Sequence, residues 1–308
     1  MIFKQPFTPD DVKRSNTVPV TSALYARSTY SGVEGLVYFV EDYIKPLVKG
    51  LLTPSDRELA ILATYYRAVG YMLSILRLDA PWHYQSVSAA SRSILELYLD
   101  IVLLARDQTS ESAERFHAFT RVERFRVAER IVDFFDANLK EQQDDITAQR
   151  KLVGDTKAKA EIEALVEKFW GRATNGRLLW PSHWSLYQDA RSRAKALGAS
   201  FEAMYVRFAY QLSWHVHPGA AGVGGISREN FDTFVAIAHR LVVEVMTDVF
   251  TLVCQELGFS KVIGDFEKRI DFLRHISGFR LVDLSLQELG EPQRFTFLEA
   301  GRTEPASP

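Results

Sequence analysis

Apolar residues recur every three or four positions along most of the chain, a spacing that predicts amphipathic helices joined by short turns. Two stretches are the most apolar, residues 94–105 and 233–254, yet they carry charged residues such as Glu96 and Arg240. Each such charge costs about 2.5–3.5 kcal/mol at the centre of a bilayer. We therefore expect both stretches to be buried helices of a soluble protein rather than membrane spans.

The residues between the apolar stretches set the expected limits of the helices. Ser55 and Glu58 have the spacing of a capping box, Gly258 is a typical helix stop, and Pro46 predicts a kink or break. The expected helices cover residues 35–52, 55–78, 82–106, two long segments within 110–170, and then 182–197, 200–215 and 227–257.

Apolar and polar residues alternate near the C-terminus, at 282–289 and 294–298, on either side of a Gly-Glu-Pro-Gln turn. A period of two predicts a β-hairpin. The expected fold class is all-α, an antiparallel helical bundle of about eight or nine helices with a small C-terminal β-hairpin. The expected division of the chain is an N-terminal extension (1–30), a helical domain (31–280), the hairpin (281–300) and a disordered tail (301–308).

Composition adds few limits on function. The 308 residues hold 37 Lys and Arg against 39 Asp and Glu, so no global field attracts nucleic acid or an anionic membrane. The single cysteine, Cys254, excludes an internal disulfide framework and fits a reducing compartment. It lies among apolar residues, which favours a core position over a nucleophile. Because the first residues lack the layout of a signal peptide, the expected location is the cytoplasm.

Two of the predicted helices share one pattern, an arginine followed after four and eight residues by two carboxylates: Arg92, Glu96 and Asp100, and Arg240, Glu244 and Asp248. This spacing puts each trio on one helix face. One interpretation is a polar stripe on each helix whose charges pair with one another within that helix. The other is that the two stripes face each other across the bundle and line a polar cavity. A di-metal site needs two Glu-x-x-His motifs, and the chain has one, at Glu114 and His117, so we expect neither a metal nor a cofactor.

Tryptophan and histidine residues concentrate between residues 170 and 217, where one predicted helix ends with Tyr210, Ser213 and His217 on a common face. A helix C-terminus favours the protonated form of a histidine, and such a residue can serve as a general acid or base. The alternative is a helix stop made by the His-Pro-Gly sequence at 217–219, with the aromatic residues in the core.

Residues 82–100, which include Arg92 and Glu96, and the later segment YQLSWHVHPGA together resemble a bacterial family of uncharacterised helical proteins, a domain of unknown function. In that family an early helix carries Arg and Glu, and a later helix ends in a Tyr-x-x-Ser…His-Pro motif. The resemblance covers residues 51–257 and implies no established activity.

More distantly, an all-helical chain with a helix-terminal histidine resembles the HEPN ribonucleases of toxin and phage-defence systems. Those enzymes place an arginine a few residues before a histidine at a dimer interface. Here Arg207 and His215 have seven residues between them, so the spacing departs from that signature.

Two functions stay open. One is a helical binding or scaffold protein with a buried Arg, Glu and His polar cluster. The other is a HEPN-like, metal-independent ribonuclease. Its catalytic residues would be His217 as acid and base, with Tyr210, Ser213, Arg92 and Glu96. The candidate ligand-binding residues are His83, Arg207, Trp214 and His215. RNA, a small molecule and a second copy of the chain stay open as partners, and solvent access to His217 distinguishes the two functions.

Overall fold

The computed structural model of this chain describes residues 22–78, 83–107, 111–138, 146–187, 189–216 and 228–276. Regular secondary structure within these ranges is helical, apart from one isolated β-bridge between Arg172 and Leu178. The expected all-α class is therefore confirmed for this part of the chain. The β-hairpin predicted for 281–300 and the tail 301–308 lie outside the described residues.

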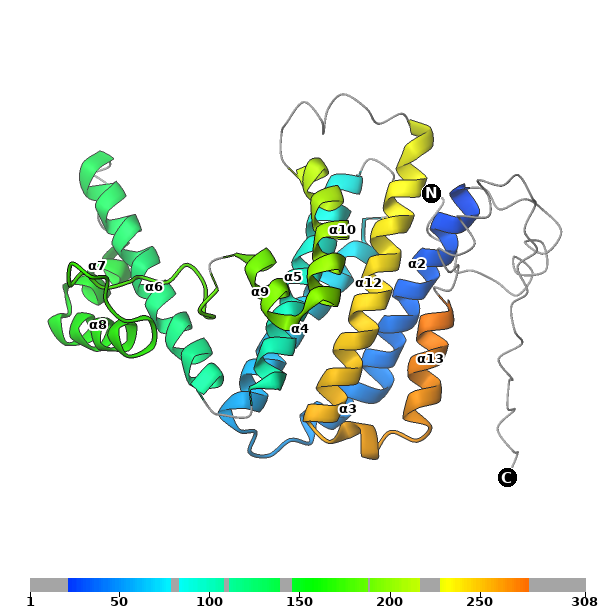
Figure 1. Cartoon of the computed structure of the whole chain (residues 1–308), viewed down its shortest axis with the longest axis horizontal. Coiled ribbons are helices and arrows are strands. Elements are labelled where there is room, and N and C mark those ends of the chain that lie inside the picture. Colours follow the sequence, from blue (N-terminus) through cyan, green and yellow to red (C-terminus); the bar gives the residue numbers. More distant parts are fainter. Residues whose placement is uncertain are drawn as a thin grey trace.

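A body of long helices forms most of the molecule, and its members lie side by side in Figure 1. Two of them, α5 and α12, lie against each other at its centre: α12 also packs against α2, α4 and α13, and α5 also packs against α4 and α10. The body comprises α2 (Ser22–Phe39), α4 (Asp56–Leu76), α5 (Tyr84–Arg106), α10 (Ala199–Val216), α12 (Arg228–Glu256) and α13 (Phe266–Ile276).

The main core lies between α5 and α12, the helices that contain the two most apolar stretches. Their buried residues recur at helical spacing, including Leu95 and Leu99 of α5 and Met246, Phe250 and Val253 of α12. Cys254 is also fully buried in this cluster, so its expected core position is confirmed. Both stretches are therefore core helices, as the interrupted apolar pattern predicted.

Local signals placed two helix ends correctly. The Ser55 hydroxyl accepts from the Glu58 N–H at 3.3 Å, and the Ser55 N–H donates to the Glu58 carboxylate at 2.6 Å, which completes the capping box that opens α4. Gly258 follows α12 with a φ of 72°, a left-handed conformation that favours glycine. These ends depend on neighbouring residues alone, which explains why the sequence predicted them.

The first helix differs from expectation. We expected residues 35–52 with a break at Pro46, whereas α2 begins at Ser22, inside the expected extension 1–30, and continues into a π-helical turn, Val40–Ile44, and a short helix α3, Lys45–Lys49. The Lys45 N–H bonds to the carbonyl of Val40, five residues back, and Pro46 follows in the first turn of α3. Proline is tolerated there because the first turn of a helix needs no N–H donor.

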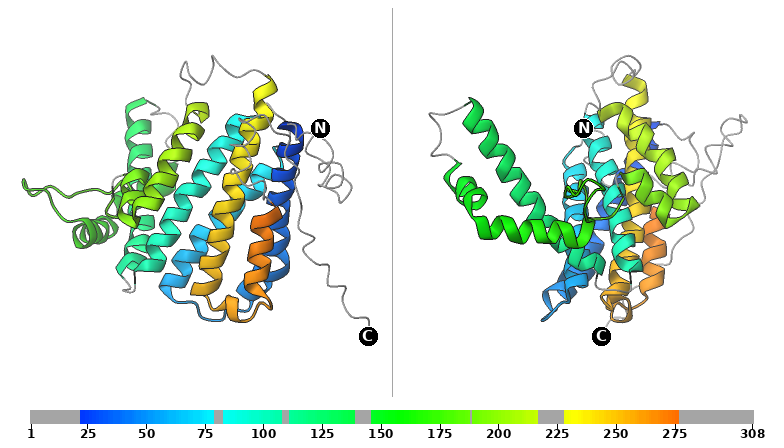
Figure 2. Two further views of the ribbon diagram at one scale, coloured as in Figure 1. Left: turned by 45° about the vertical axis from the view of Figure 1, so that its right-hand side comes forward. Right: turned by 60° about the vertical axis from the view of Figure 1, so that its left-hand side comes forward.

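Three further helices form an arm that projects from the body, as Figure 2 shows: α6 (Glu111–Asn138), α7 (Thr147–Gly154) and α8 (Thr156–Trp170). The sequence predicted two long helices here. A break separates α7 from α8 at Asp155, whose carboxylate accepts from the N–H groups of Lys157 and Ala158 and so caps α8. The arm has a small core of its own, formed by Val122, Phe125, Ile162 and Val166.

Between arm and body, the helix expected at 182–197 is shorter than predicted. Only α9, Ala190–Leu197, is helical, and residues 182–187 form an irregular loop. Asp189 caps α9 by accepting from the Ser192 N–H at 2.7 Å. The loop side chains have partners elsewhere in the fold, His183 on α5 and Trp184 on α6, and these contacts override the local helical pattern.

One helix of the described part of the chain, α4, is long and apolar enough to cross a membrane by length and composition alone. Half of its most apolar window is buried inside the molecule. Core helices pass the same test, so this single helix is weak support for a membrane span.

Candidate functional site

Five polar side chains from three segments meet on one side of α5. They are Arg92, Glu96 and Asp100 of α5, His183 of the loop 182–187, and Arg193 of α9. We call these five residues the polar cluster. Arg92 and Glu96 were predicted as site residues, and Asp100 was predicted to share their helix face.

Arg193 is the centre of the polar cluster, and its side chain is only 5% exposed. Its Nε lies 3.2 Å from Asp100 Oδ1 and its Nη2 lies 3.7 Å from Glu96 Oε2. Glu96 also accepts from Arg92 Nε at 3.0 Å. Two arginines thus face two carboxylates, and the formal charges cancel. This balance matters because an unpaired ion in a protein interior costs several kcal/mol.

Helix α10 closes one side of the polar cluster. Tyr205 of α10 is buried, and its pKa is raised by burial and, to a smaller extent, by the negative charge of Glu96. The phenol therefore stays protonated at neutral pH and adds no charge to the polar cluster.

His183 has defined hydrogen-bond roles. Its Nδ1 accepts from the Ser185 backbone N–H at 3.1 Å and also lies 2.9 Å from the Ser185 hydroxyl. Since a backbone N–H can only donate, Nδ1 is the unprotonated nitrogen and the ring proton is on Nε2. The Nε2–H then donates to Asp100 Oδ2 at 3.3 Å. A neutral His183 thus connects the loop 182–187 to the buried carboxylate of α5.

Ser185, His183 and Asp100 follow one another in the order of a nucleophile, a base and an orienting carboxylate. The geometry does not favour that chemistry. Ser185 is buried, and the lone pair of Nδ1 that would take its proton already accepts the Ser185 backbone N–H. His183 and Ser185 instead form a turn that is hydrogen-bonded to Asp100 of α5.

The loop 182–187 also binds the arm. Trp184 is buried, and its ring packs edge-on against Phe116 of α6 with centroids 5.8 Å apart. His183 lies 6.1 Å from the Phe119 ring. Arg126 of α6 donates to the carbonyl of Pro181, just before the loop. The polar cluster therefore lies at the junction where the arm meets the body.

Sequence reasoning missed the cluster roles of His183 and Arg193. A signal for Arg193 exists in the periodicity of α9: it shares a face with the buried residues Ala190, Ala194 and Leu197. Arg191, two residues earlier, is on the other side and is 56% exposed. His183 belongs to the concentration of tryptophan and histidine at residues 170–217, but its contact with Asp100 depends on the fold of an irregular loop.

The second stripe does not face the first, which corrects the hypothesis of a shared polar cavity. Arg240 pairs with Glu244 on its own helix at 2.8 Å, and Asp248 accepts from Tyr98 of α5 at 3.2 Å and from Arg274 of α13 at 3.0 Å. No ion pair joins the two stripes within the described ranges. The reason is geometric: α5 and α12 meet through their apolar faces, so Arg240 pairs within α12, and Asp248 meets Tyr98 on a different face of α5 from the polar cluster.

The remaining predicted site residues are scattered or undescribed. Arg207 is exposed on α10, with its guanidinium 5.3 Å from the Phe208 ring, and His83 is the half-buried residue that precedes α5. The backbones of Tyr210, Ser213, Trp214 and His215 belong to α10, but their side chains lie outside the described part, as does all of His217.

Metal-binding geometry is absent from the residues that the structure describes: no group of three or more His, Cys, Asp and Glu side chains could hold an ion. The Glu-x-x-His pair has other partners, since Glu114 binds Lys168 at 2.9 Å and His117 Nε2 contacts the carbonyl of Asp56 at 2.9 Å. Another histidine, His239 of α12, is fully buried, and burial lowers its pKa to about 3.

Comparison with known proteins gives one match. Residues 58–232 match a family of unknown function, DUF5677. This match confirms the resemblance to an uncharacterised family that the motifs predicted. No curated protein and no solved structure matches the chain.

Proposed function

The chain belongs to DUF5677, a family of unknown function, and from the geometry of its polar cluster we propose that it is a non-catalytic binding or scaffold protein. The observation that carries this proposal is the pairing of Arg193 with Asp100 and Glu96 at a site where the arginine side chain is only 5% exposed. A guanidinium so deeply buried between two carboxylates is suited to holding helices together. It is poorly suited to meeting a substrate.

In this proposal the polar cluster fixes the arm against the body. Arg193 attaches α9 to α5, His183 attaches the loop 182–187 to α5, and Trp184 attaches the same loop to α6. The body is an antiparallel helical bundle in this proposal. Because the polar cluster holds the arm in one orientation, the arm presents the same surface to a binding partner. Buried ionic groups of this kind favour one register over others because a shifted register leaves a charge unpaired.

The test replaces the central arginine and measures the free energy of unfolding in urea. Arg193→Met should cost about 3–5 kcal/mol, because it leaves Asp100 buried without its cation. Arg191→Met is the matched control on the same helix: its side chain is 56% exposed and pairs loosely with Glu202 at 3.4 Å. We expect the control to cost less than about 1 kcal/mol.

Two further measurements distinguish a junction from ordinary core. In the double variant Asp100→Asn with Arg193→Met, no unpaired charge remains between these positions, so its cost should be smaller than the sum of the two single variants. In Arg193→Met the backbone amides of the loop 182–187 should exchange hydrogen faster than in the wild type, while the amides of α12 should exchange at the wild-type rate. Equal costs for Arg193→Met and Arg191→Met would contradict the proposed role.

The ribonuclease alternative depends on His217, which lies outside the described residues. Its test is RNA cleavage by the purified chain and by Arg92→Ala and His217→Ala. Wild-type cleavage that both variants lose while keeping the wild-type melting temperature would overturn the non-catalytic proposal.

We also propose a cytoplasmic location. It is supported by the near-balanced charge and by a single cysteine, Cys254, which is buried in the core. Fractionation of cells that express the full chain tests this location.

A further inference from the structure

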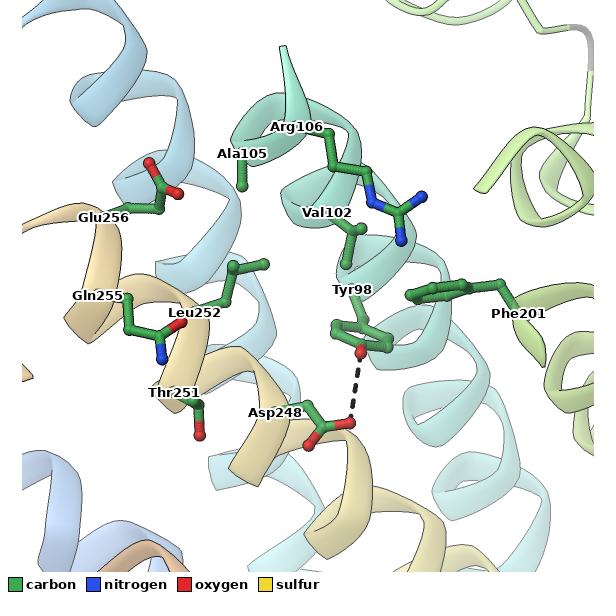
Figure 3. Close-up of a pocket in the computed structure, with 10 residues that line it drawn as sticks. All are labelled: Tyr98, Val102, Ala105, Arg106, Phe201, Asp248, Thr251, Leu252, Gln255 and Glu256. Atoms are coloured by element: carbon green, nitrogen blue, oxygen red, sulfur yellow. Dashed lines mark hydrogen bonds between the residues drawn. The ribbon is translucent and has the colours of Figure 1, made fainter. Parts of the chain in front are cut away.

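A groove lies on the face of α5 between α10 and α12, and Figure 3 shows the side chains that line it. Its volume is about 590 Å³, within the range of roughly 300–1,000 Å³ that small-molecule sites occupy. Tyr98, Val102 and Arg106 of α5 form its floor and one end, Phe201 of α10 forms one wall, and Leu252 and Gln255 of α12 belong to the other wall.

The carboxylates of the groove already have cationic partners. Asp248 accepts from the Tyr98 hydroxyl at 3.2 Å, drawn as a dashed line in Figure 3, and pairs with Arg274 at 3.0 Å. Glu256 pairs with Arg57 at 2.7 Å. Neither carboxylate is therefore an open site for a cation.

Arg106 differs from these residues because it has no acidic partner in the part of the chain that the structure describes. Its Nη1 donates to the carbonyl of Leu197 at 2.7 Å, at the end of α9, and its guanidinium lies 5.1 Å from the centre of the Phe201 ring. The remaining N–H groups of this exposed guanidinium make no described hydrogen bond. The uncompensated charge of the groove is consequently positive.

The apolar part of the groove lies next to this charge. The rings of Tyr98 and Phe201 have centroids 5.9 Å apart. Phe201 and Leu252 are half-buried and offer apolar surface, whereas Tyr98 and Val102 are largely covered and form the floor. Arginine binds carboxylates through paired N–H donors. Aromatic ligands stack on aromatic side chains such as Phe201 and Tyr98. The groove thus combines one anion-binding group with a surface for a ring.

We propose that this groove binds a small aromatic carboxylate, with the carboxylate on Arg106 and the ring against Phe201 and Tyr98. The proposal rests on the proposed binding function and names a ligand class for it. It uses a different face of α5 from the polar cluster. The two proposals can therefore fail separately, since one is measured by unfolding and the other by affinity.

The experiment compares three probes with one ring system and different charges: 2-naphthoate, 2-naphthalenemethanol and 2-naphthylmethylammonium. Affinities for the full chain are measured by calorimetry. We expect 2-naphthoate to bind most tightly. Arg106→Gln should weaken it about tenfold, the loss expected for a charge-assisted hydrogen bond, and should leave the alcohol unchanged.

Arg269→Gln is the matched control. Arg269 also lies over an aromatic ring, 4.6 Å from the centre of Tyr43, and also donates to a backbone carbonyl, that of Gly264 at 2.8 Å, but it does not line the groove. We expect this variant to bind 2-naphthoate like the wild type. Gln255→Trp, at an exposed position on the groove wall, should fill the groove and abolish binding of both the acid and the alcohol.

Three results would overturn the proposal. One is equal affinity of wild type for the acid and the alcohol, and another is tighter binding of the ammonium probe. The third is no binding of 2-naphthoate at millimolar concentration. Because Arg106 also binds the end of α9, the unchanged affinity of Arg106→Gln for the alcohol serves as the check that the groove itself is intact.

Discussion

The buried histidine of α12 makes the stability of this protein dependent on pH. His239 has no exposed surface, and its ring packs 5.7 Å from the ring of Tyr30 of α2. Burial disfavours the imidazolium and lowers the pKa of His239 from an ordinary value of 6.5 to about 3. In the unfolded chain the same histidine takes up a proton near its ordinary pKa. Folding therefore excludes a proton whenever the pH lies between these two values.

The direction of the effect follows from proton uptake. Above pH 6.5 both states are neutral at His239, and the residue adds no pH dependence. Below it the unfolded state binds one more proton, so the free energy of unfolding decreases by about 1.4 kcal/mol per pH unit. Between pH 7 and pH 5 the loss is about 2 kcal/mol, and it continues until the pH approaches the native pKa.

The perturbation is His239→Gln, which keeps a polar side chain but cannot titrate. Urea unfolding followed by circular dichroism at pH 7 and pH 5 gives the free energy of unfolding for both proteins. We expect the wild type to lose about 2 kcal/mol more than the variant over this interval. The pH dependence that comes from the carboxylates is the same in both proteins, so it cancels in the comparison. Should the glutamine variant not fold, His239→Leu provides the same contrast.

Equal losses for wild type and variant would refute the reasoning. They would mean that His239 titrates near its ordinary pKa in the folded protein, and thus that water reaches the ring. The chemical shift of the His239 ring protons supplies an independent check: it should stay constant in the folded protein from pH 7 to pH 5.

The remaining predictions concern single positions. Ser55→Ala should cost about 1 kcal/mol of unfolding free energy by removing the cap of α4, while Ser55→Asp should retain it; equal losses would argue against the capping role. Gly258→Ala should cost roughly 1–2 kcal/mol, because alanine is strained at a left-handed φ, and urea unfolding measures this cost. Burial raises the pKa of Cys254 to about 12, so iodoacetamide should label it at pH 8 only after unfolding, and rapid labelling of the folded protein would contradict its burial.

The capping residues show why part of the fold follows from the sequence. Ser55, Asp155 and Gly258 act on backbone groups within three or four residues, so each has the same effect wherever the helix lies in space. Asp155 belongs to this group even though the division of the arm into α7 and α8 was missed. Its side chain caps α8 by the same kind of local contact. The break was missed because the charged residues of segment 110–170 continue through it without a change of pattern.

The sequence by itself determined the all-α class of the described residues, the burial of α5 and α12, and the placement of Arg92, Glu96 and Asp100 on one face. All of these follow from helical periodicity, which relates residues of a single segment. Only the tertiary structure decided what that face meets. Arg193 and His183 reach Asp100 from segments more than eighty residues away, and the stripe on α12 has partners outside the polar cluster. A pattern within one helix specifies which side chains share a face, but the partner of that face depends on how all the helices pack together.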